Sequence, residues 1–522
     1  MKRQVILLSI LFALFGWSNC LHAQKLVLEK TYEIDKKAKK GYLNSVTTNT
    51  GDKTTTLSFV TKSNSKKVMY QNYIFDKEYN FIKKEEKEDV FTNAKYKSEK
   101  GEKYVVDGVT LEQGFSLNIK KRRIEYSWSW INFRYEKKIT LLDKVKLKDE
   151  EGNKYWLVKQ FENDQTGDIY AMVIASGKTA TPNEYTLIKI GQDLKVEITD
   201  KISFKKQKGF RGSFYIPVEN PNETNDDDGE TENDMSNSDL CFIFAAEFTP
   251  DKDRLGENTD FEMIRVSKEG KVIKRIEFKV KSSEWNIINV TANAGSLYFI
   301  GPANEGKPLG ASKVSVSFGE NTKYNFYQIA KITGDNVDYV TSTKLDEFEA
   351  KLKKPASQKK SPEYKGKKFT IRNISVAKDG AVFIYGQNFS GEKWDDILMF
   401  YFDKTGVLKA QYGVRLEERN DFSEKRMARQ FIKLTDANAY WEIWELEDID
   451  DGRALQYPNI SKINLATGDI SDFQKFGTVK DKPTYYLQNS YPCIINPEDN
   501  SLIYLGQNKK SNILWFGKIV VE

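Results

Sequence analysis

Short runs of apolar residues recur along this chain, at 57–60, 170–174, 241–244, 297–301, 382–386, 440–444 and 502–506. All but the last are followed by a segment in which apolar and polar residues alternate around a charged or glycine-containing turn. Alternation with a period of two indicates strands with one buried face, and Asp, Asn and Gly supply the backbone conformations that tight turns need. The pattern therefore predicts a chain built of β-strands and hairpins.

The spacing of these units narrows the fold class. Most successive units lie roughly 55 to 85 residues apart, which fits one propeller blade of ~40–50 residues plus its loops. The distance between the first two units, at 57–60 and 170–174, is about double that between other units. Residues 104–140 therefore have room for a further blade. We therefore expect an all-β protein, a β-propeller of seven or eight antiparallel blades. The strands predicted at 26–32 and 513–521 are expected to pair and close the last blade, because closure removes exposed sheet edges.

Two insertions interrupt the repeats. Residues 219–238 are acidic and polar without an aromatic residue, which is typical of a solvated loop. Residues 345–368 begin with a short predicted helix at 345–354 and continue with a lysine-rich tract that contains two prolines. We interpret this second insertion either as a flexible excursion between blades or as a boundary between two half-assemblies.

The first 23 residues have the pattern of a secretory signal peptide. Lys2 and Arg3 precede an apolar run, and small and polar residues lead to Ala23. A lipoprotein signal acylated at Cys20 is disfavoured, because bulky and polar residues precede that cysteine. The predicted parts are therefore a signal peptide at 1–23 and a β-propeller at 24–522, and the expected location is periplasmic or extracellular.

Composition and charge exclude some classes of partner. Aromatic residues make up 13% of the chain, which favours strands. Without Lys2 and Arg3 the basic residues fall from 81 to 79 against 75 acidic residues, a net charge of +4, so we expect no nucleic acid as a partner. No other apolar stretch approaches the length of a membrane-spanning helix. We therefore expect no transmembrane segment in the mature chain.

Cleavage of the signal peptide would remove His22, the only histidine. The mature chain would then lack the imidazole that Ser-His-Asp catalysis, Cys-His catalysis and histidine-ligated metal require. The sequence has no phosphate-binding glycine loop, and we expect no cofactor. Cys241 and Cys493 lie beside apolar residues and are interpreted as small buried side chains, with a disulfide as the alternative.

Two segments carry candidate binding residues. In the acidic loop, Asp226 and Asp228 could supply oxygen ligands to calcium, but their spacing departs from that of an EF-hand loop, so no metal is predicted. Trp128 and Trp130 follow a basic stretch and could stack on sugar rings. Their alternation with polar residues favours packing in the core instead.

The most concentrated candidate chemistry lies at 441–451. Trp441 and Trp444 precede a run of acidic residues that includes Glu445 and Asp448. Two carboxylates beside aromatic rings are what a glycosidase uses as an acid and as a base or nucleophile. Glu445 and Asp448 are therefore candidate catalytic residues and the two tryptophans candidate binding residues, with an acidic loop without catalysis as the alternative.

The repeated strand-and-hairpin units and the Ala23–Gln24 junction resemble those of secreted bacterial β-propeller-like proteins of uncharacterised families. The resemblance implies a rigid surface that presents loops to a ligand. We therefore predict an exported, non-catalytic binding or scaffold protein of the bacterial cell envelope, with an envelope protein or a glycan as its partner. The alternative is a histidine-free carbohydrate-active enzyme that uses paired carboxylates.

Overall fold

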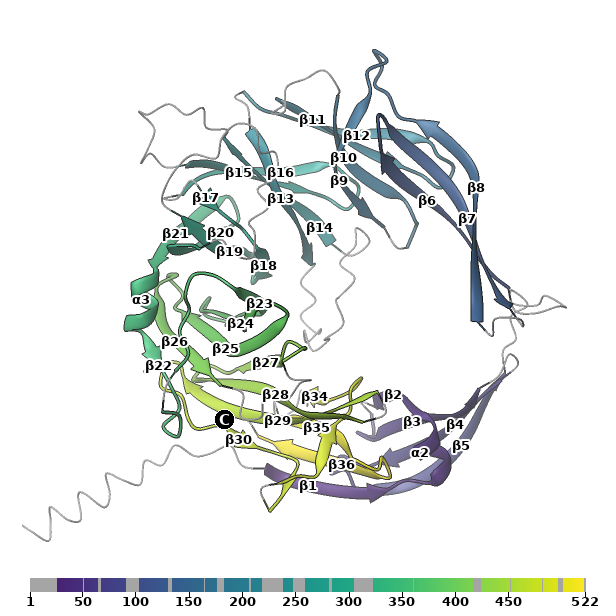
Figure 1. Cartoon of the computed structure of the whole chain (residues 1–522), viewed down its shortest axis with the longest axis vertical. Coiled ribbons are helices and arrows are strands. Elements are labelled where there is room, and N and C mark those ends of the chain that lie inside the picture. The colour runs from purple at the N-terminus through teal and green to yellow at the C-terminus, as the bar shows by residue number, and fades with distance from the viewer. Residues whose placement is uncertain are drawn as a thin grey trace, which may run out of the picture. The chain divides into compact units, whose positions relative to one another are not determined.

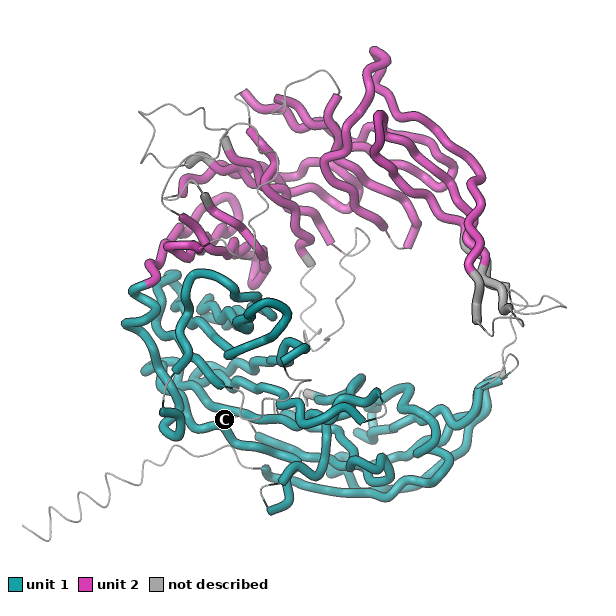
Figure 2. Tube along the Cα trace, in the orientation of Figure 1, with its two compact units in different colours: residues 1–92, 346–522 teal, residues 93–345 magenta. Residues whose placement is uncertain are grey.

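The computed structural model describes residues 26–49, 51–63, 67–90, 103–129, 134–163, 165–175, 183–205, 208–217, 238–246, 259–280, 284–304, 323–359, 361–415, 424–450, 452–480, 482–495 and 501–520. The chain forms two compact units. Unit 1 combines residues 1–92 with residues 346–522, and unit 2 spans residues 93–345 (Figure 2).

Unit 2 contains four antiparallel sheets that follow one another along the chain (Figure 1). The first sheet comprises β6 (Lys103–Gln113), β7 (Leu117–Ser129) and β8 (Arg134–Lys146). The second comprises β9 (Tyr155–Glu162), β10 (Ile169–Ala175), β11 (Glu184–Ile190) and β12 (Val196–Ser203). The third comprises β13 (Lys208–Pro217), β14 (Ser238–Ala246), β15 (Thr259–Val266) and β16 (Val272–Val280). The fourth comprises β17 (Glu284–Trp285), β18 (Asn289–Asn293), β19 (Ser296–Asn304), β20 (Phe326–Thr333) and β21 (Asn336–Lys344).

Unit 1 also contains four sheets of four or five strands. The first comprises β22 (Leu352–Lys353), β23 (Phe369–Val376), β24 (Val382–Ser390), β25 (Lys393–Phe402) and β26 (Leu408–Val414). The second comprises β27 (Arg429–Leu434), β28 (Asn438–Asp450), β29 (Arg453–Asn464) and β30 (Gln474–Lys475). The third comprises β1 (Leu26–Glu33), β33 (Tyr485–Leu487), β34 (Cys493–Ile495), β35 (Leu502–Asn508) and β36 (Ile513–Ile519). The fourth comprises β2 (Tyr42–Thr48), β3 (Thr55–Ser63), β4 (Lys67–Phe75) and β5 (Phe81–Val90).

A two-stranded ribbon and two short helices complete the described elements, namely β31 (Thr478–Val479), β32 (Lys482–Pro483), α2 (Lys36–Lys40) and α3 (Leu345–Ala350). The prediction of an all-β protein with many antiparallel sheets is confirmed. Each of the apolar runs found in the sequence lies in a central strand of a sheet, from 57–60 in β3 to 502–506 in β35. The region 104–140 also forms a sheet, as expected.

Neighbouring sheets within a unit pack face to face, and β14 shows how the sequence achieves this. Leu240, Phe242 and Phe244 point to one side and pack against the sheet β9–β12. Cys241 and Ile243 alternate with them and pack on the other side against the sheet β17–β21. Because successive side chains of a strand point to opposite faces, a continuous apolar run fits a strand that is buried on both sides. β14 therefore contributes to two cores.

The strands nearest the two ends of the sequence pair with each other. β1 runs antiparallel to β36, with Thr31 opposite Trp515. The indole N–H of Trp515 also donates to the carboxylate of Glu29 over 2.7 Å. The predicted pairing of these strands is thus present, and it joins the two segments of sequence that form unit 1.

The insertion at 345–368 is packed against a sheet rather than forming a loose excursion. The side chain of Phe348 on α3 is fully buried, and its ring lies 4.9 Å from that of Phe400. β22 pairs in parallel with β26, and the amide of Gln358 donates to the carbonyl of Gly413 over 2.8 Å. The division between the units falls at 345–346, at the start of this segment.

Several predicted features lie outside the described residues. These are the signal peptide at 1–23 and nearly all of the acidic insertion at 219–238. Among the described residues, no helix has the length and apolar character that crossing a membrane requires.

Candidate functional site

The segment with the most candidate chemistry forms β28 in unit 1, and its alternation divides the side chains between two faces. Trp441 and Ile443 pack against the sheet β22–β26. Tyr440 and Trp444 point the other way and pack against the sheet that contains β35 and β36. The register of β28 is regular up to Leu446. It follows that Glu442 lies on the face of Trp444, whereas Glu445 lies on the face of Trp441.

Glu445 lines a small pocket at the edge of this sheet. The lining residues are Arg426, Met427, Ala428, Trp444, Glu445, Leu446 and Gln456. Only 3% of Glu445 is exposed, while Arg426 is exposed at the surface. The cavity volume is about 10 Å³, roughly the space of one water molecule. The pocket therefore has a buried acidic residue in its lining and space for only a very small group.

Hydrogen bonds to the neighbouring sheet fix the backbone beside the pocket. The N–H of Ala428 donates to the side-chain carbonyl of Gln387 over 2.7 Å. Two residues later, the amide of Gln430 donates to the carbonyl of Gly386 over 3.0 Å. Both glutamines are buried, so these bonds are shielded from water. They attach the start of β27, and with it one wall of the pocket, to β24.

Glu442 is occupied by a different network on the opposite face. Its carboxylate accepts hydrogen bonds from the indole N–H of Trp444 and, over 2.6 Å, from the hydroxyl of Tyr504. Burial raises the pKa of Tyr504, and the Glu442 carboxylate adds to this effect. The Arg429 guanidinium lies over the Trp444 ring, 5.3 Å from its centre. The polar atom of Trp444 is thus bound within the protein, and its ring forms part of the core.

The structure does not bring the predicted catalytic pair together. Glu445 is buried in the pocket, whereas the side chain of Asp448 is 42% exposed and forms an ion pair with Lys509 over 3.2 Å. A β-bulge between Leu446 and Asp448 changes the register at this point. The backbone N–H of Ile449 and the hydrogen bond from Lys509 lower the pKa of Asp448. A glycosidase acid needs a raised pKa, so Asp448 is unsuited to that role.

The two predicted binding tryptophans of β28 do not form an exposed surface. Trp441 is completely buried and Trp444 is 6% exposed, so neither offers a free ring face to a sugar. Trp128 lies in β7, where its backbone pairs with Tyr135, but its side chain lies outside the described residues. Trp130 and the predicted metal-binding residues Asp226 and Asp228 also lie outside them. The described residues contain no group of three or more His, Cys, Asp or Glu side chains placed to hold a metal ion.

The cysteines occupy different surroundings. Cys241 is completely buried in unit 2, and burial raises the pKa of its thiol, which confirms its interpretation as a small buried side chain. Cys493 is partly exposed in unit 1. Among the described residues, neither cysteine forms a disulfide.

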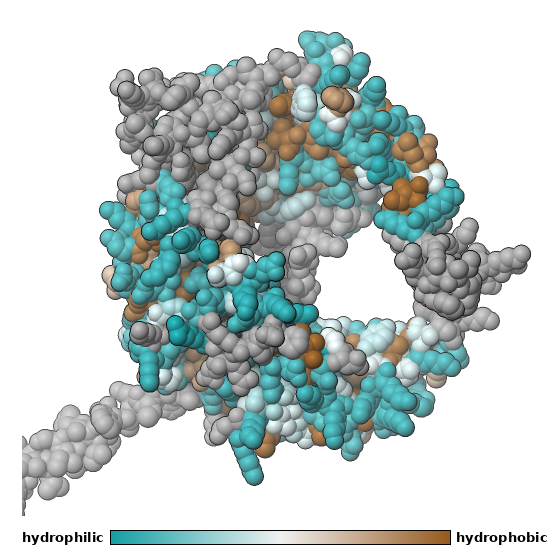
Figure 3. Space-filling view, viewed as in Figure 1, coloured by the Kyte–Doolittle hydropathy of each residue, from teal (hydrophilic) through white to brown (hydrophobic). Residues whose placement is uncertain are grey.

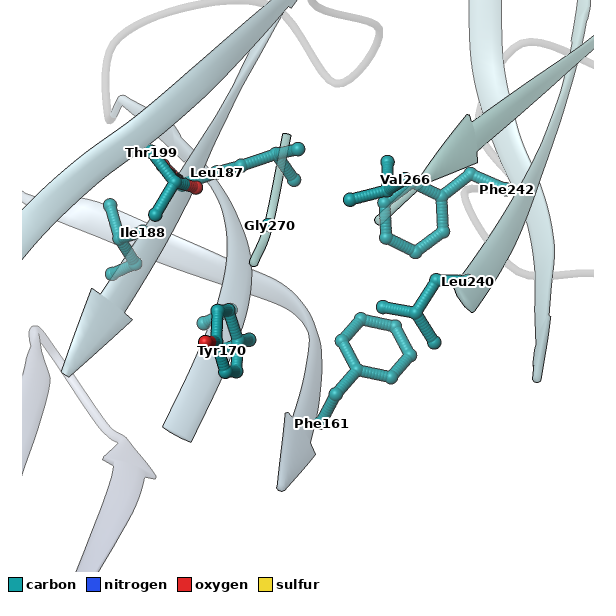
Figure 4. A pocket seen from close by; sticks show the side chains of 10 residues that line it. Phe161, Tyr170, Leu187, Ile188, Thr199, Leu240, Phe242, Val266 and Gly270 are labelled. Carbon is teal, nitrogen blue, oxygen red and sulfur yellow. Dashed lines mark hydrogen bonds between the residues drawn. The ribbon is translucent and has the colours of Figure 1, made fainter. Parts of the chain in front are cut away.

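A second cavity lies between the sheets β9–β12 and β13–β16 of unit 2 (Figure 4). Phe161 and Phe242 line it together with Leu240, and Gly270 approaches from the turn between β15 and β16. Its volume is also about 10 Å³, and the lining is almost entirely apolar. An apolar gap of this size is a packing defect between two sheets, because it has no charged group to orient a ligand.

Exposed apolar side chains occur elsewhere on the surface. Figure 3 shows hydrophobic patches interspersed with hydrophilic surface on the face in view. On β8 of unit 2, Ile139 and Leu141 are each about half exposed, at 53% and 52%. These side chains stand on β8, an edge strand of the sheet β6–β7–β8. Of the two cavities described above, the Glu445 pocket is the one with ionisable groups in its lining.

No family model and no curated protein matches the chain. Among solved structures, the chain is similar to the β-propeller domain of the trilobed protease from Pyrococcus furiosus, at 10% identity over 79% of this chain and 93% of that one, with a TM-score of 0.23. It is also similar to an α-L-arabinanase from Penicillium chrysogenum, at 10% identity over 70% and 94%, with a TM-score of 0.26. A third is an apocarotenoid oxygenase from Synechocystis, at 8% identity over 78% and 84%, with a TM-score of 0.28.

These findings correct the prediction of a non-catalytic binding or scaffold protein. That prediction took the fold class as one used for rigid binding surfaces, but the similar solved structures include enzymes, the arabinanase and the oxygenase. A sequence that folds into repeated antiparallel sheets does not exclude catalysis. Function has to be argued from the site itself.

Proposed function

We propose that the protein recognises a ligand through a primary ammonium group that enters the Glu445 pocket. The observation that carries this proposal is the buried carboxylate of Glu445 in a cavity of about 10 Å³. An ammonium group is close to a water molecule in size and carries three N–H donors. The Glu445 carboxylate and the amide carbonyl of Gln456, which also lines the pocket, are acceptors for such donors.

A charged partner suits this pocket better than a neutral one. The two oxygens of a carboxylate offer about four acceptor sites, so a carboxylate can accept hydrogen bonds from more than one donor. Hydrogen bonds in which both partners are ionised are roughly twice as strong as those between neutral groups. An ammonium ligand therefore gains more from Glu445 than a hydroxyl of the same size.

The test is calorimetric titration of the full chain with ethylamine and with ethanol. We expect ethylamine to bind and ethanol to bind at least about tenfold more weakly, a difference of about 1.4 kcal/mol. Glu445→Gln keeps the shape of the side chain and should abolish the preference for the amine. Glu197→Gln on the exposed strand β12 is the matched control and should leave binding unchanged. Equal binding of both compounds to the parent and to Glu445→Gln would show that the carboxylate is not the recognition group.

We further propose that the sheets are blades of a β-propeller of eight blades and that residues 1–23 direct export. Support for the blades comes from sheets that follow one another in sequence, share cores within each unit and include the pairing of β1 with β36. Support for export comes from the order of residue types in residues 1–23, where basic residues are followed by an apolar run and then by small and polar residues. N-terminal sequencing of protein recovered from outside the cytoplasm should begin at Gln24, and retention of Met1 would contradict export.

A further inference from the structure

We infer that unit 1 binds an unbranched polymer of phosphate groups at a basic patch formed by α2 and the end of β3. The basic patch consists of four exposed lysines, Lys36, Lys39, Lys40 and Lys62. The whole chain is nearly balanced, with 81 basic and 75 acidic residues, so these four form a local concentration of charge. None of them lines the Glu445 pocket, and the inference is independent of the proposed function.

The sheet β2–β5 holds the backbone of α2 in place. Ala38, in the middle of the helix, is 1% exposed and shares a core with Ile34. Gly41, which follows the helix, approaches β3 so closely that a Cβ atom there would collide with the carbonyl oxygen of Val60. α2 therefore packs against β3 (Figure 1). Because Ala38 is the buried residue of the helix, the lysines on either side of it are left at the surface.

β3 adds the fourth lysine to the basic patch. Lys62 follows two residues after Val60 and lies opposite Met69 on β4. Met69 is on the same face of β4 as Tyr73, and Tyr73 packs in one core with Ala38. Lys62 therefore lies on the face of the sheet that α2 covers, next to the end of the helix.

The four lysines are not paired within the part of the chain that the structure describes. The nearby carboxylates of Asp35 and Glu86 pair with Lys84 and Lys37 instead, and β2 and β3 contain no acidic residue. Lysines three and four positions apart on a helix are neighbours, and like charges at this spacing repel. A bound anion removes this repulsion. The arrangement is therefore complementary to a ligand with several negative charges.

The residue type and the surroundings select the kind of anion. The lysine ammonium is a compact point charge that binds phosphate well, without the paired oxygens that a guanidinium recognises. A flat anionic membrane would also approach β5, which adjoins α2 and carries exposed carboxylates at Glu85, Glu86 and Glu88. Those carboxylates would be repelled. A narrow chain of phosphate groups can follow the lysines alone, so we infer a polymer rather than a membrane.

Linked phosphate groups gain affinity that single ones lack. One contact between an exposed lysine and a phosphate is weak, because water and salt screen it. After the first contact forms, the other groups of the same chain bind at a high effective concentration. We therefore expect a polymer that reaches all four lysines to bind at least about tenfold more tightly than pyrophosphate.

The experiment is calorimetric titration of the full chain with inorganic phosphate, pyrophosphate and short-chain polyphosphate at several salt concentrations. Polyphosphate should bind most tightly. With four phosphate contacts, the logarithm of its affinity should fall with the logarithm of the salt concentration with a slope of about 3. Equal affinity for pyrophosphate and polyphosphate, or no binding of polyphosphate, would overturn the inference. Sedimentation with phosphatidylglycerol vesicles is the second arm, and binding of vesicles without binding of polyphosphate would also overturn it.

Variants assign the binding to the basic patch. The triple variant Lys36→Gln, Lys39→Gln and Lys40→Gln should weaken polyphosphate at least about tenfold and lower the slope to about 1. The matched control changes three exposed lysines elsewhere, Lys159→Gln, Lys268→Gln and Lys404→Gln, and should alter the affinity less than about twofold. Equal losses in the two triple variants would show that overall charge is responsible.

A single variant outside the helix guards against a loss of folding in the first triple variant. Lys62→Gln leaves α2 intact and should lower the slope by about 1. An unchanged slope would remove β3 from the site and overturn the inference as stated. Glu445→Gln should leave polyphosphate binding unchanged, so the failure of either proposal is seen separately from the other.

Discussion

A buried ion-pair network in unit 2 offers the sharpest test of the described packing. The ammonium of Lys208 lies 2.5 Å from Glu262 and 2.8 Å from Glu277. The side chains of Lys208 and Glu262 are only 9% and 4% exposed. Arg275 donates to the other oxygen of Glu262 over 2.7 Å. The perturbation is Lys208→Met, which keeps the length of the side chain and removes its charge.

The expected loss can be estimated from these distances. At an effective dielectric constant of about 20, two unit charges 2.5 Å apart attract by about 7 kcal/mol. Removing lysine from water offsets several kcal/mol of this attraction. Arg275 also continues to neutralise Glu262 in the variant. We therefore expect Lys208→Met to lower the free energy of unfolding by about 2–3 kcal/mol, the lower part of the range for a broken buried pair.

The assay is thermal unfolding followed by circular dichroism, with urea unfolding as the second measurement. For a unit of roughly 250 residues, a loss of this size lowers Tm by about 4–12 °C. Lys274→Met is the matched control, because Lys274 pairs with the 88% exposed Asp335 and should cost less than about 1 kcal/mol. The double variant Lys208→Met with Glu262→Leu should recover stability relative to Lys208→Met, since no buried carboxylate remains without its partner. Equal stability of Lys208→Met and Lys274→Met would refute the reasoning.

Three further predictions concern other parts of the structure. Gly386→Ala would place a Cβ atom 2.1 Å from the backbone carbonyl of Thr370 and should lower the free energy of unfolding in urea by about 1–3 kcal/mol, whereas Gly108→Ala has open space and should not. Glu29→Gln weakens the hydrogen bond from Trp515 between the terminal strands and should cost about 1 kcal/mol in thermal unfolding, with Glu33→Gln as the neutral control. The hydrogen bond from Lys208 lowers the pKa of Glu277 below its ordinary value of 4.5, so its contribution to stability is present above about pH 4.5 and is lost as the pH falls through the folded-state pKa. Unfolding curves between pH 3 and 6 should show this loss in the parent and not in Lys208→Met.

The local pattern of apolar and polar residues was sufficient to predict the strands. It did not predict which charged side chains form ion pairs between strands. The run at 240–244 is apolar at every position, and the structure buries it on both faces, as a central strand requires. In the sequence, Glu262 is one polar residue between the apolar residues Phe261 and Met263. Its burial depends on Lys208, which lies 54 residues away, and on Arg275 on the next strand. Long-range pairing of this kind leaves no signal in the local pattern.

The acidic run at 442–448 shows where local reasoning failed at the site. Four acidic residues close together in sequence suggested a catalytic pair, Glu445 and Asp448, but a strand distributes them by alternation. Glu442 is bonded to Trp444 and Tyr504 on one face, and Glu445 enters a pocket on the other. The bulge before Asp448 then leads that residue to Lys509 at the surface.

The residue that sequence reasoning missed is Arg426, which lies 19 positions before Glu445 and belongs to no motif. It reaches the pocket because β27 pairs with β28 in antiparallel register, with Arg429 opposite Trp444. Extending that register places residue 428 opposite Glu445, so the segment 426–428 must border the carboxylate. The hydrogen bond from Ala428 to Gln387 then holds this segment in place. The lining of the pocket is thus a product of strand pairing, which brings residues 426–428 beside Glu445.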